Sequence, residues 1–242
     1  MKSKILALAT GLCLSLAGSN LTAEEAAPTP DHKLSGSLGL TTNYLFRGIR
    51  QTGNGPAFQG WLRYDYTPLG LYGGIWASNV KSEGFAGASM ETDFSLGWAP
   101  TFDKLGLDIG YLRYQYFRTD YDDNNTDEFH IGANYDLGVV VPSLTVNYSN
   151  DWYGTGNSWY YDLSAKVPLP AEVSLALHYG WNKFDRVYDD YSDWRIGVSK
   201  EFFGLGFDLS YIGTSGLDEN RNCDNVTFKC DDQLVFTISK AF

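Results

Sequence analysis

The sequence has 242 residues, of which 43% are hydrophobic and 16% aromatic, and its formal net charge is −11. The high aromatic content excludes an intrinsically disordered chain. The negative charge argues against a nucleic-acid-binding protein, because such proteins need clustered Lys and Arg. The 26 glycines, against 8 prolines, favour many strands joined by tight turns over helices.

The first 23 residues are predicted to be a secretory signal peptide. Lys2 and Lys4 precede a short apolar run, and small or polar residues follow as far as Ala23. The apolar run is too short to cross a bilayer as a helix. Residues 24–33 are predicted to form a flexible lead, so the folded domain is expected to span residues 34–242.

Two cysteines remain in the exported chain, Cys223 and Cys230, and both lie in an acidic stretch. Two thiols seven residues apart in an exported protein favour a local disulfide that closes a loop. A metal site is the alternative interpretation. It would need further ligands nearby, and this stretch has no histidine.

Apolar and polar residues alternate with a period of two from residue 34 almost to the end of the chain, which is the pattern of β-strands. The first predicted strand carries Leu34, Tyr44 and Phe46 on one face. Five connections are very short and six are long and polar, which predicts a meander of antiparallel hairpins with two different ends. The twelve predicted strands are 34–46, 58–66, 71–80, 90–99, 105–117, 127–137, 143–152, 158–167, 173–183, 194–203, 205–213 and 233–242.

Three features favour a transmembrane barrel over a soluble all-β domain. Most predicted strands have about ten residues, the length that a tilted strand needs to cross the hydrocarbon layer. The polar faces carry more ionisable groups than a dry core tolerates unpaired. Aromatic pairs also end the apolar faces, as in interfacial girdles. These pairs are Tyr44 and Phe46, Tyr64 and Tyr66, Trp159 and Tyr161, Tyr179 and Trp181, and Phe236 with the terminal Phe242. The predicted fold is therefore all-β, a transmembrane antiparallel up-and-down β-barrel of about twelve strands.

One block of the sequence resembles a known family. Residues 36–48 read Gly-Ser-Leu-Gly-Leu-Thr-Thr-Asn-Tyr-Leu-Phe-Arg-Gly, and Gln51-Thr52 and Pro56-Ala-Phe-Gln-Gly60 follow. This block resembles the proteobacterial TorF-type porins, also called the Gcw_chp family. The likeness is most specific over residues 36–66. The resemblance implies an outer-membrane β-barrel proposed to be a porin, and it implies neither catalytic residues nor a substrate.

The polar faces of the predicted strands and the adjoining loop supply the candidate pore-lining residues. Their arginines could oppose acidic groups across a constriction, or could be paired with acids inside a plugged barrel. The candidates are Arg47, Arg63, Asp65, Glu91, Asp93, His130, Asp162 and Arg195.

Acidic residues crowd the long connections. Candidates are Asp120, Asp122 and Asp123 in one loop, and Asp189 and Asp190, with Asp193, in another. An acidic vestibule enriches cations near the mouth of a channel, so we expect an open lumen to prefer cations mildly. The loop 120–128 lacks the glycine and the bidentate Glu of an EF-hand, which leaves a solvated loop or weak divalent binding.

The sequence therefore predicts a porin-like channel for the passive diffusion of small hydrophilic solutes across a Gram-negative outer membrane. Its expected partners are those solutes, outer-membrane lipid and lipopolysaccharide, with no nucleic acid and no cofactor. A non-conducting barrel for adhesion or envelope structure is a second possibility. A lipid hydrolase in which His130 or His178 pairs with a serine is a third. Neither histidine lies in a recognisable nucleophile motif, so an enzyme is not expected.

Overall fold

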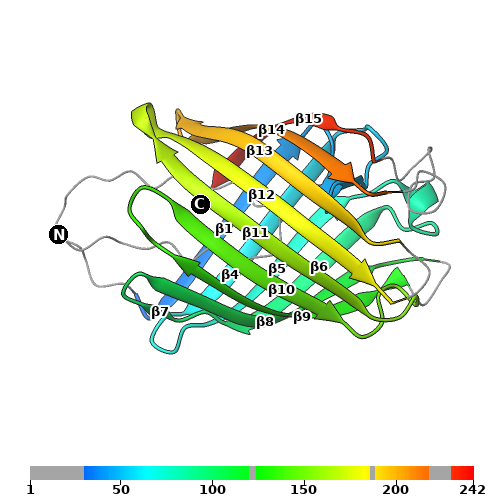
Figure 1. The fold of residues 1–242 in the computed structure, drawn as a ribbon, viewed down its shortest axis with the longest axis horizontal. Helices are drawn as coiled ribbons and strands as arrows, with labels where there is room; N and C mark the ends of the chain where they lie inside the picture. Colours follow the sequence, from blue (N-terminus) through cyan, green and yellow to red (C-terminus); the bar gives the residue numbers. More distant parts are fainter. Residues whose placement is uncertain (1–29, 120–123, 186–188, 218–229) are drawn as a thin grey trace.

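The computed structural model describes residues 30–119, 124–185, 189–217 and 230–242. Within these residues, twelve strands of 9 to 12 residues form one closed antiparallel barrel (Figure 1). Each pairs with the next long strand, and β1 pairs with β15 to close the ring, with Leu40 opposite Ile238. The wall consists of β1 (His32–Thr41), β4 (Ala57–Tyr66), β5 (Leu71–Asn79), β6 (Met90–Trp98), β8 (Leu105–Tyr116), β9 (Thr126–Tyr135), β10 (Val141–Ser149), β11 (Ser158–Leu169), β12 (Val173–Phe184), β13 (Tyr191–Phe202), β14 (Leu205–Ser215) and β15 (Gln233–Ala241).

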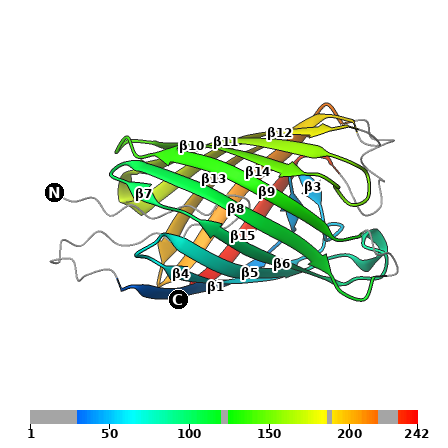
Figure 2. The same cartoon turned by 90° about the horizontal axis from the view of Figure 1, so that it is seen from below.

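The two ends of the barrel differ, as the connection lengths predict. At the short-turn end, tight turns join the strands, together with β7 (Thr101–Phe102) and η3 (Pro170–Glu172). At the long-loop end lie β2 (Leu45–Phe46), β3 (Ile49–Arg50) and η1 (Ser82–Gly84) (Figure 2). No helix in the described part of the chain is long and apolar enough to cross a membrane.

The two faces of the barrel wall differ in chemistry. Large apolar side chains point outward and stay exposed, such as Leu38, Leu96, Ile131 and Leu163 at 49–64%. Serine, threonine and charged side chains alternate with them and point inward. A water-soluble protein does not leave so wide an apolar surface exposed. The fold is therefore that of a transmembrane barrel, apolar toward lipid and polar inside.

The predicted first strand, 34–46, is wrong at both ends. Strand β1 begins two residues earlier, at His32, and ends at Thr41, after which the chain turns into the barrel. Tyr44 is 7% exposed and packs on Trp76 with ring centroids 5.2 Å apart. Tyr44 and Phe46 therefore do not belong to an outer aromatic girdle. The alternation misled because β2 is itself extended and continues the period of two.

Candidate functional site

The connection between β1 and β4, residues 42–56, folds into the barrel, and we call it the inner loop. Its strands β2 and β3 form a hairpin that pairs Leu45 with Arg50 and Phe46 with Ile49. The two turn residues, Arg47 and Gly48, have φ angles of 47° and 78°. Two consecutive positive φ angles are typical of a type I′ turn, which strongly favours glycine. The Arg-Gly pair therefore sets the tip of the hairpin.

The tip of the inner loop contacts opposite parts of the wall. The Tyr191 hydroxyl on β13 donates to the Arg47 carbonyl oxygen at 3.1 Å. Gly48 packs so closely on β14 that a Cβ there would lie 2.4 Å from the Thr214 Cγ2 atom. On the other side, Arg47 Nη2 donates to both carboxylate oxygens of Glu128 on β9, at 2.7 and 2.8 Å. Because β9 and β14 are separated by four strands in the ring, the loop crosses the lumen.

Arg47 is the central cation of this contact. Its guanidinium carbon lies 4.0 Å from the ring centroid of Tyr160 and 4.8 Å from that of Trp152, so the charge rests on aromatic faces. Burial alone would lower the pKa of Arg47, but the Glu128 carboxylate outweighs burial and raises it above the ordinary value. Arg47 therefore stays charged, and its ion pair with Glu128 holds the inner loop against the wall.

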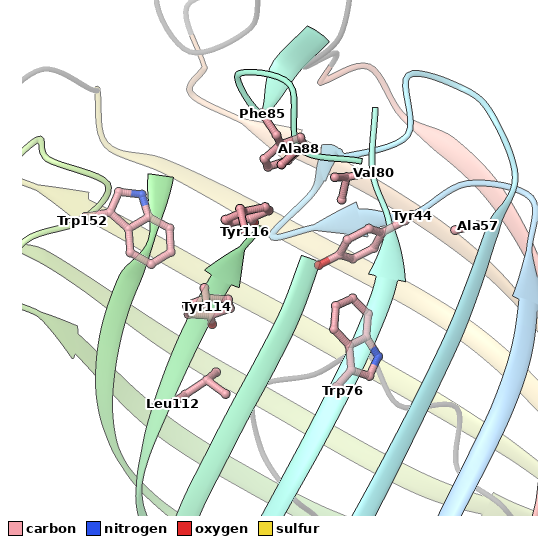
Figure 3. Packing of buried hydrophobic residues seen from close by; sticks show 10 residues of the cluster. All are labelled: Tyr44, Ala57, Trp76, Val80, Phe85, Ala88, Leu112, Tyr114, Tyr116 and Trp152. Atoms are coloured by element: carbon pink, nitrogen blue, oxygen red, sulfur yellow. The ribbon is translucent and has the colours of Figure 1, made fainter. Parts of the chain in front are cut away.

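An aromatic cluster packs around the inner loop in the long-loop half of the barrel (Figure 3). Ring centroids lie 5.5 Å apart for Phe46 and Tyr114, and 4.7 Å apart for Phe85 and Tyr116. Toward the short-turn end, inward-facing positions carry small polar side chains that remain partly exposed, such as Ser35, Ser143, Ser174 and Ser199. The long-loop half of the lumen is therefore packed with aromatic side chains. The short-turn half combines small polar groups with charged ones, such as the paired Arg63 and Asp65. The buried members of the cluster are Tyr44, Ala57, Trp76, Val80, Phe85, Ala88, Leu112, Tyr114, Tyr116 and Trp152.

The structure brings the predicted pore-lining arginines into ion pairs. Arg47 contacts Glu128 at 2.7 Å, Arg63 contacts Asp65 at 2.8 Å, and Arg195 contacts Asp208 at 2.9 Å. Of the two arrangements that the sequence left open, pairing with acids inside the barrel is the one observed. All eight predicted residues lie on the inner side of the wall or in the inner loop, and their role in a pore stays a prediction. Their side chains are those of Arg47, Arg63, Asp65, Glu91, Asp93, His130, Asp162 and Arg195.

His130 on β9 and His178 on β12 contact carboxylates in the interior. His130 Nε2 lies 3.2 Å from Asp108 Oδ1. His178 lies between two acids, with Nδ1 at 3.0 Å from Asp162 Oδ1 and Nε2 at 2.7 Å from Asp193 Oδ2. Asp193 was predicted to lie in an exposed loop. Because β13 already begins at Tyr191, its carboxylate instead faces the lumen at 3% exposure.

One serine lies close enough to His178 to raise the hydrolase alternative. Ser164 Oγ is 3.2 Å from His178 Nδ1. A carboxylate at each ring nitrogen favours the imidazolium form, which has no lone pair left to accept the serine proton. His178 also faces the interior and not the lipid-facing belt, so this cluster does not favour a lipid hydrolase.

Sequence reasoning missed the acidic partners of the arginines. Glu128 and Asp208 both follow the inward alternation of their strands, which is the signal that places them in the lumen. Which arginine each one meets depends on strand register and on the inner loop, and the alternation specifies neither.

Glu91 and Asp93 differ from the other interior acids. They face inward from β6, each is 2% exposed, and neither forms an ion pair with a described residue. One oxygen of each, Glu91 Oε2 and Asp93 Oδ1, has no hydrogen-bond partner among the described residues.

Several predictions fall on residues outside the described ranges and stay predictions. These residues are the signal peptide 1–23, the loop acids Asp120, Asp122 and Asp123, and Cys223 of the Cys223–Cys230 disulfide. Of the other loop acids, Asp189 and Asp190 lie at the long-loop end. Asp190 Oδ1 accepts a hydrogen bond from the Phe184 backbone N–H at 2.9 Å.

A family model matches residues 25–242, and it is described as a bacterial protein of unknown function (Gcw_chp). The chain belongs to the Gcw_chp family. That description assigns no activity, so the TorF-type porin name in the resemblance stays a proposal for this Gcw_chp protein. No curated protein matches the sequence.

Solved structures similar to the Gcw_chp chain are outer-membrane channels. The KdgM porin is 6% identical with a TM-score of 0.58, and the alignment covers 86% of this chain and 98% of that one. The NanC porin is 10% identical with a TM-score of 0.55 and the same coverage. An outer membrane channel from Pseudomonas putida F1 is 12% identical with a TM-score of 0.52, covering 93% and 100%. At these identities the likeness shows the fold alone.

Proposed function

We propose that this Gcw_chp protein is a porin-like channel of the Gram-negative outer membrane, through which small hydrophilic solutes diffuse passively with a preference for cations. The closed barrel and its outward apolar belt support placement in a membrane. In this placement the short turns face the periplasm, the long loops face outward, and lipid and lipopolysaccharide surround the wall.

The pairing of interior charges is the observation that carries the cation preference. Arg47, Arg63 and Arg195 are each held by a carboxylate, whereas Glu91 and Asp93 have no basic partner among the described residues. A lumen with this arrangement attracts cations and offers little free positive charge to anions. Lys166, partly buried toward the short-turn end of β11, adds a basic group away from the packed half.

The similar KdgM porin gives a contrast in solute chemistry. It has been solved in complex with oligogalacturonate, which is a chain of acidic sugars. Arginines already neutralised by internal carboxylates are poorly placed to bind such a polyanion. We therefore do not extend that solute to the present chain.

Reversal potentials of the refolded barrel in a planar bilayer test this function. In a KCl gradient we expect discrete conductance steps and a reversal potential that favours K⁺. Glu91→Gln and Asp93→Asn should each reduce the preference, whereas Asp127→Asn, on the outer face of the wall, should not. A reversal potential that favours chloride would refute the cation preference.

A second candidate function is a non-conducting barrel that serves adhesion or envelope structure. The inner loop and the aromatic cluster favour it, because they pack the long-loop half of the lumen. Folded wild-type protein that gives no conductance steps, together with an equally silent variant lacking residues 44–51, would support this function over the channel.

A further inference from the structure

Three buried carboxylates and one guanidinium lie in the half of the lumen that holds the inner loop. Glu91 and Asp93 come from β6, Glu128 comes from β9, and each is 1–2% exposed. Arg47 is already bound to both oxygens of Glu128. The carboxyl groups of Glu91 and Asp93 therefore have no basic partner among the described residues. Ionising them in this buried place is costly unless a cation joins them.

Aromatic side chains surround the two unpaired acids. In the strand register, Asp93 lies between Trp76 on β5 and Tyr114 on β8, and Glu91 lies beside Tyr116 on β8. Figure 3 shows these rings, with Tyr44 of the inner loop above Trp76. The faces of aromatic rings carry negative potential, so they disfavour an anion and favour a cation at the same place.

Phenol hydroxyls supply neutral oxygen atoms around Glu91. The hydroxyls of Tyr44 and Tyr116 lie against its carboxylate. A phenol hydroxyl adds oxygen lone pairs without adding a full negative charge.

Building on the proposed channel function, we propose that Glu91 and Asp93 form a binding site for a hard divalent cation of the Ca²⁺ type within the lumen. Two unpartnered carboxylate oxygens with phenol oxygens nearby match the ligand preference of such an ion, and its charge balances that of the two acids. The close packing favours an ion that sheds its water over Mg²⁺, which retains several waters.

The small number of acidic ligands makes this a weak, exchangeable site. The described residues contain no group of three or more His, Cys, Asp or Glu side chains placed to hold a metal ion. A channel needs binding that is favourable enough to admit an ion and weak enough to release it. Glu91 and Asp93 thereby form a site at which permeating cations bind transiently.

Terbium luminescence tests the site without using conductance. Tb³⁺ replaces Ca²⁺ at oxygen sites, and a nearby Trp or Tyr sensitises its emission. We expect the refolded full-length barrel in detergent to give sensitised emission that excess Ca²⁺ removes and equal Mg²⁺ removes less. Glu91→Gln and Asp93→Asn should each weaken the apparent Tb³⁺ affinity roughly tenfold or more, because affinity follows the ligand charge.

Glu201→Gln is the matched control, since Glu201 also faces the lumen but lies near the short-turn end, away from the aromatic cluster. It should leave the emission unchanged. A heat-shift gel establishes that each isosteric variant is folded. Emission that both β6 variants retain, or that excess Ca²⁺ does not remove, would overturn the site. Cation-selective conductance without this emission would refute the site and leave the channel function standing. Emission without any conductance would support the site and refute the channel function.

Discussion

Two neighbouring acids on β9 show that the contribution of an ion pair to stability depends on which side of the wall the pair lies. Glu128 faces the lumen and pairs with Arg47, and their side chains are 1% and 6% exposed. Asp127 faces outward and pairs with Arg113, and both side chains are more than a third exposed. Removing one partner of a buried pair leaves a desolvated charge, whereas an exposed pair contributes little.

Glu128→Gln should release the inner loop. The substitution leaves the Arg47 charge buried without its partner, at a cost of about 3–5 kcal/mol that undocking of the loop relieves. We expect faster amide hydrogen exchange at residues 45–50 and larger or more frequent conductance steps. Asp127→Asn is the control and should change stability by less than about 1 kcal/mol. Equal effects of the two substitutions would contradict the role of the Arg47–Glu128 pair in holding the inner loop to the wall.

Leu177 and His178 test the orientation of the wall. Leu177 is 38% exposed on the outer face of β12, and His178 lies inside between Asp162 and Asp193. Leu177→Arg should lower the free energy of unfolding from lipid vesicles by roughly 2–4 kcal/mol if the position lies near the bilayer midplane. His178→Arg keeps a cation between the two acids and should cost less. The opposite order would mean that the outer face of β12 does not contact lipid.

At the scale of elements, the turn of the inner-loop hairpin depends on one glycine. Gly48 combines a φ of 78° with a contact to Thr214 that leaves no room for a Cβ. Gly48→Ala should therefore undock the hairpin, seen as a lower thermal midpoint and faster hydrogen exchange at residues 45–50. Gly138 has a similar φ of 83° but no atom within 4 Å of the same position. Gly138→Ala thus measures the cost of backbone strain alone. If it lowers the thermal midpoint as much as Gly48→Ala does, the close contact between Gly48 and Thr214 does not contribute.

The strands of the wall could be predicted from the sequence, whereas the inner loop could not. Alternation located all twelve strands, because a wall with lipid on one side and charge on the other imposes a strict period of two. Between residues 42 and 46 the same period continued without a wall. The Arg47-Gly48 turn was the available signal, since Gly is favoured where two positive φ angles occur together. The ion pairs across the lumen depend on strand register and on that loop, which no local pattern encodes.

At the scale of the whole molecule, acidic groups occupy two kinds of place. Asp189 and Asp190 lie among the long connections, whereas Glu91 and Asp93 lie inside the packed half of the barrel at 2% exposure. Both sets attract cations, but salt affects them differently. Ions in solution screen exposed charges over a distance that falls from about 10 Å at 0.1 M salt to about 3 Å at 1 M. Charges held among side chains are screened much less.

The salt dependence of selectivity therefore identifies which set acts as the filter. If Glu91 and Asp93 dominate, the preference for K⁺ over chloride should weaken only partly between 0.1 M and 1 M KCl at a fixed gradient ratio. Substituting both Asp189 and Asp190 with Asn should then change selectivity at 0.1 M and leave the value at 1 M nearly unaltered. The double variant Glu91→Gln with Asp93→Asn should reduce selectivity at both concentrations. Selectivity that vanishes at 1 M KCl in the wild-type protein would instead assign the filter to the exposed loops.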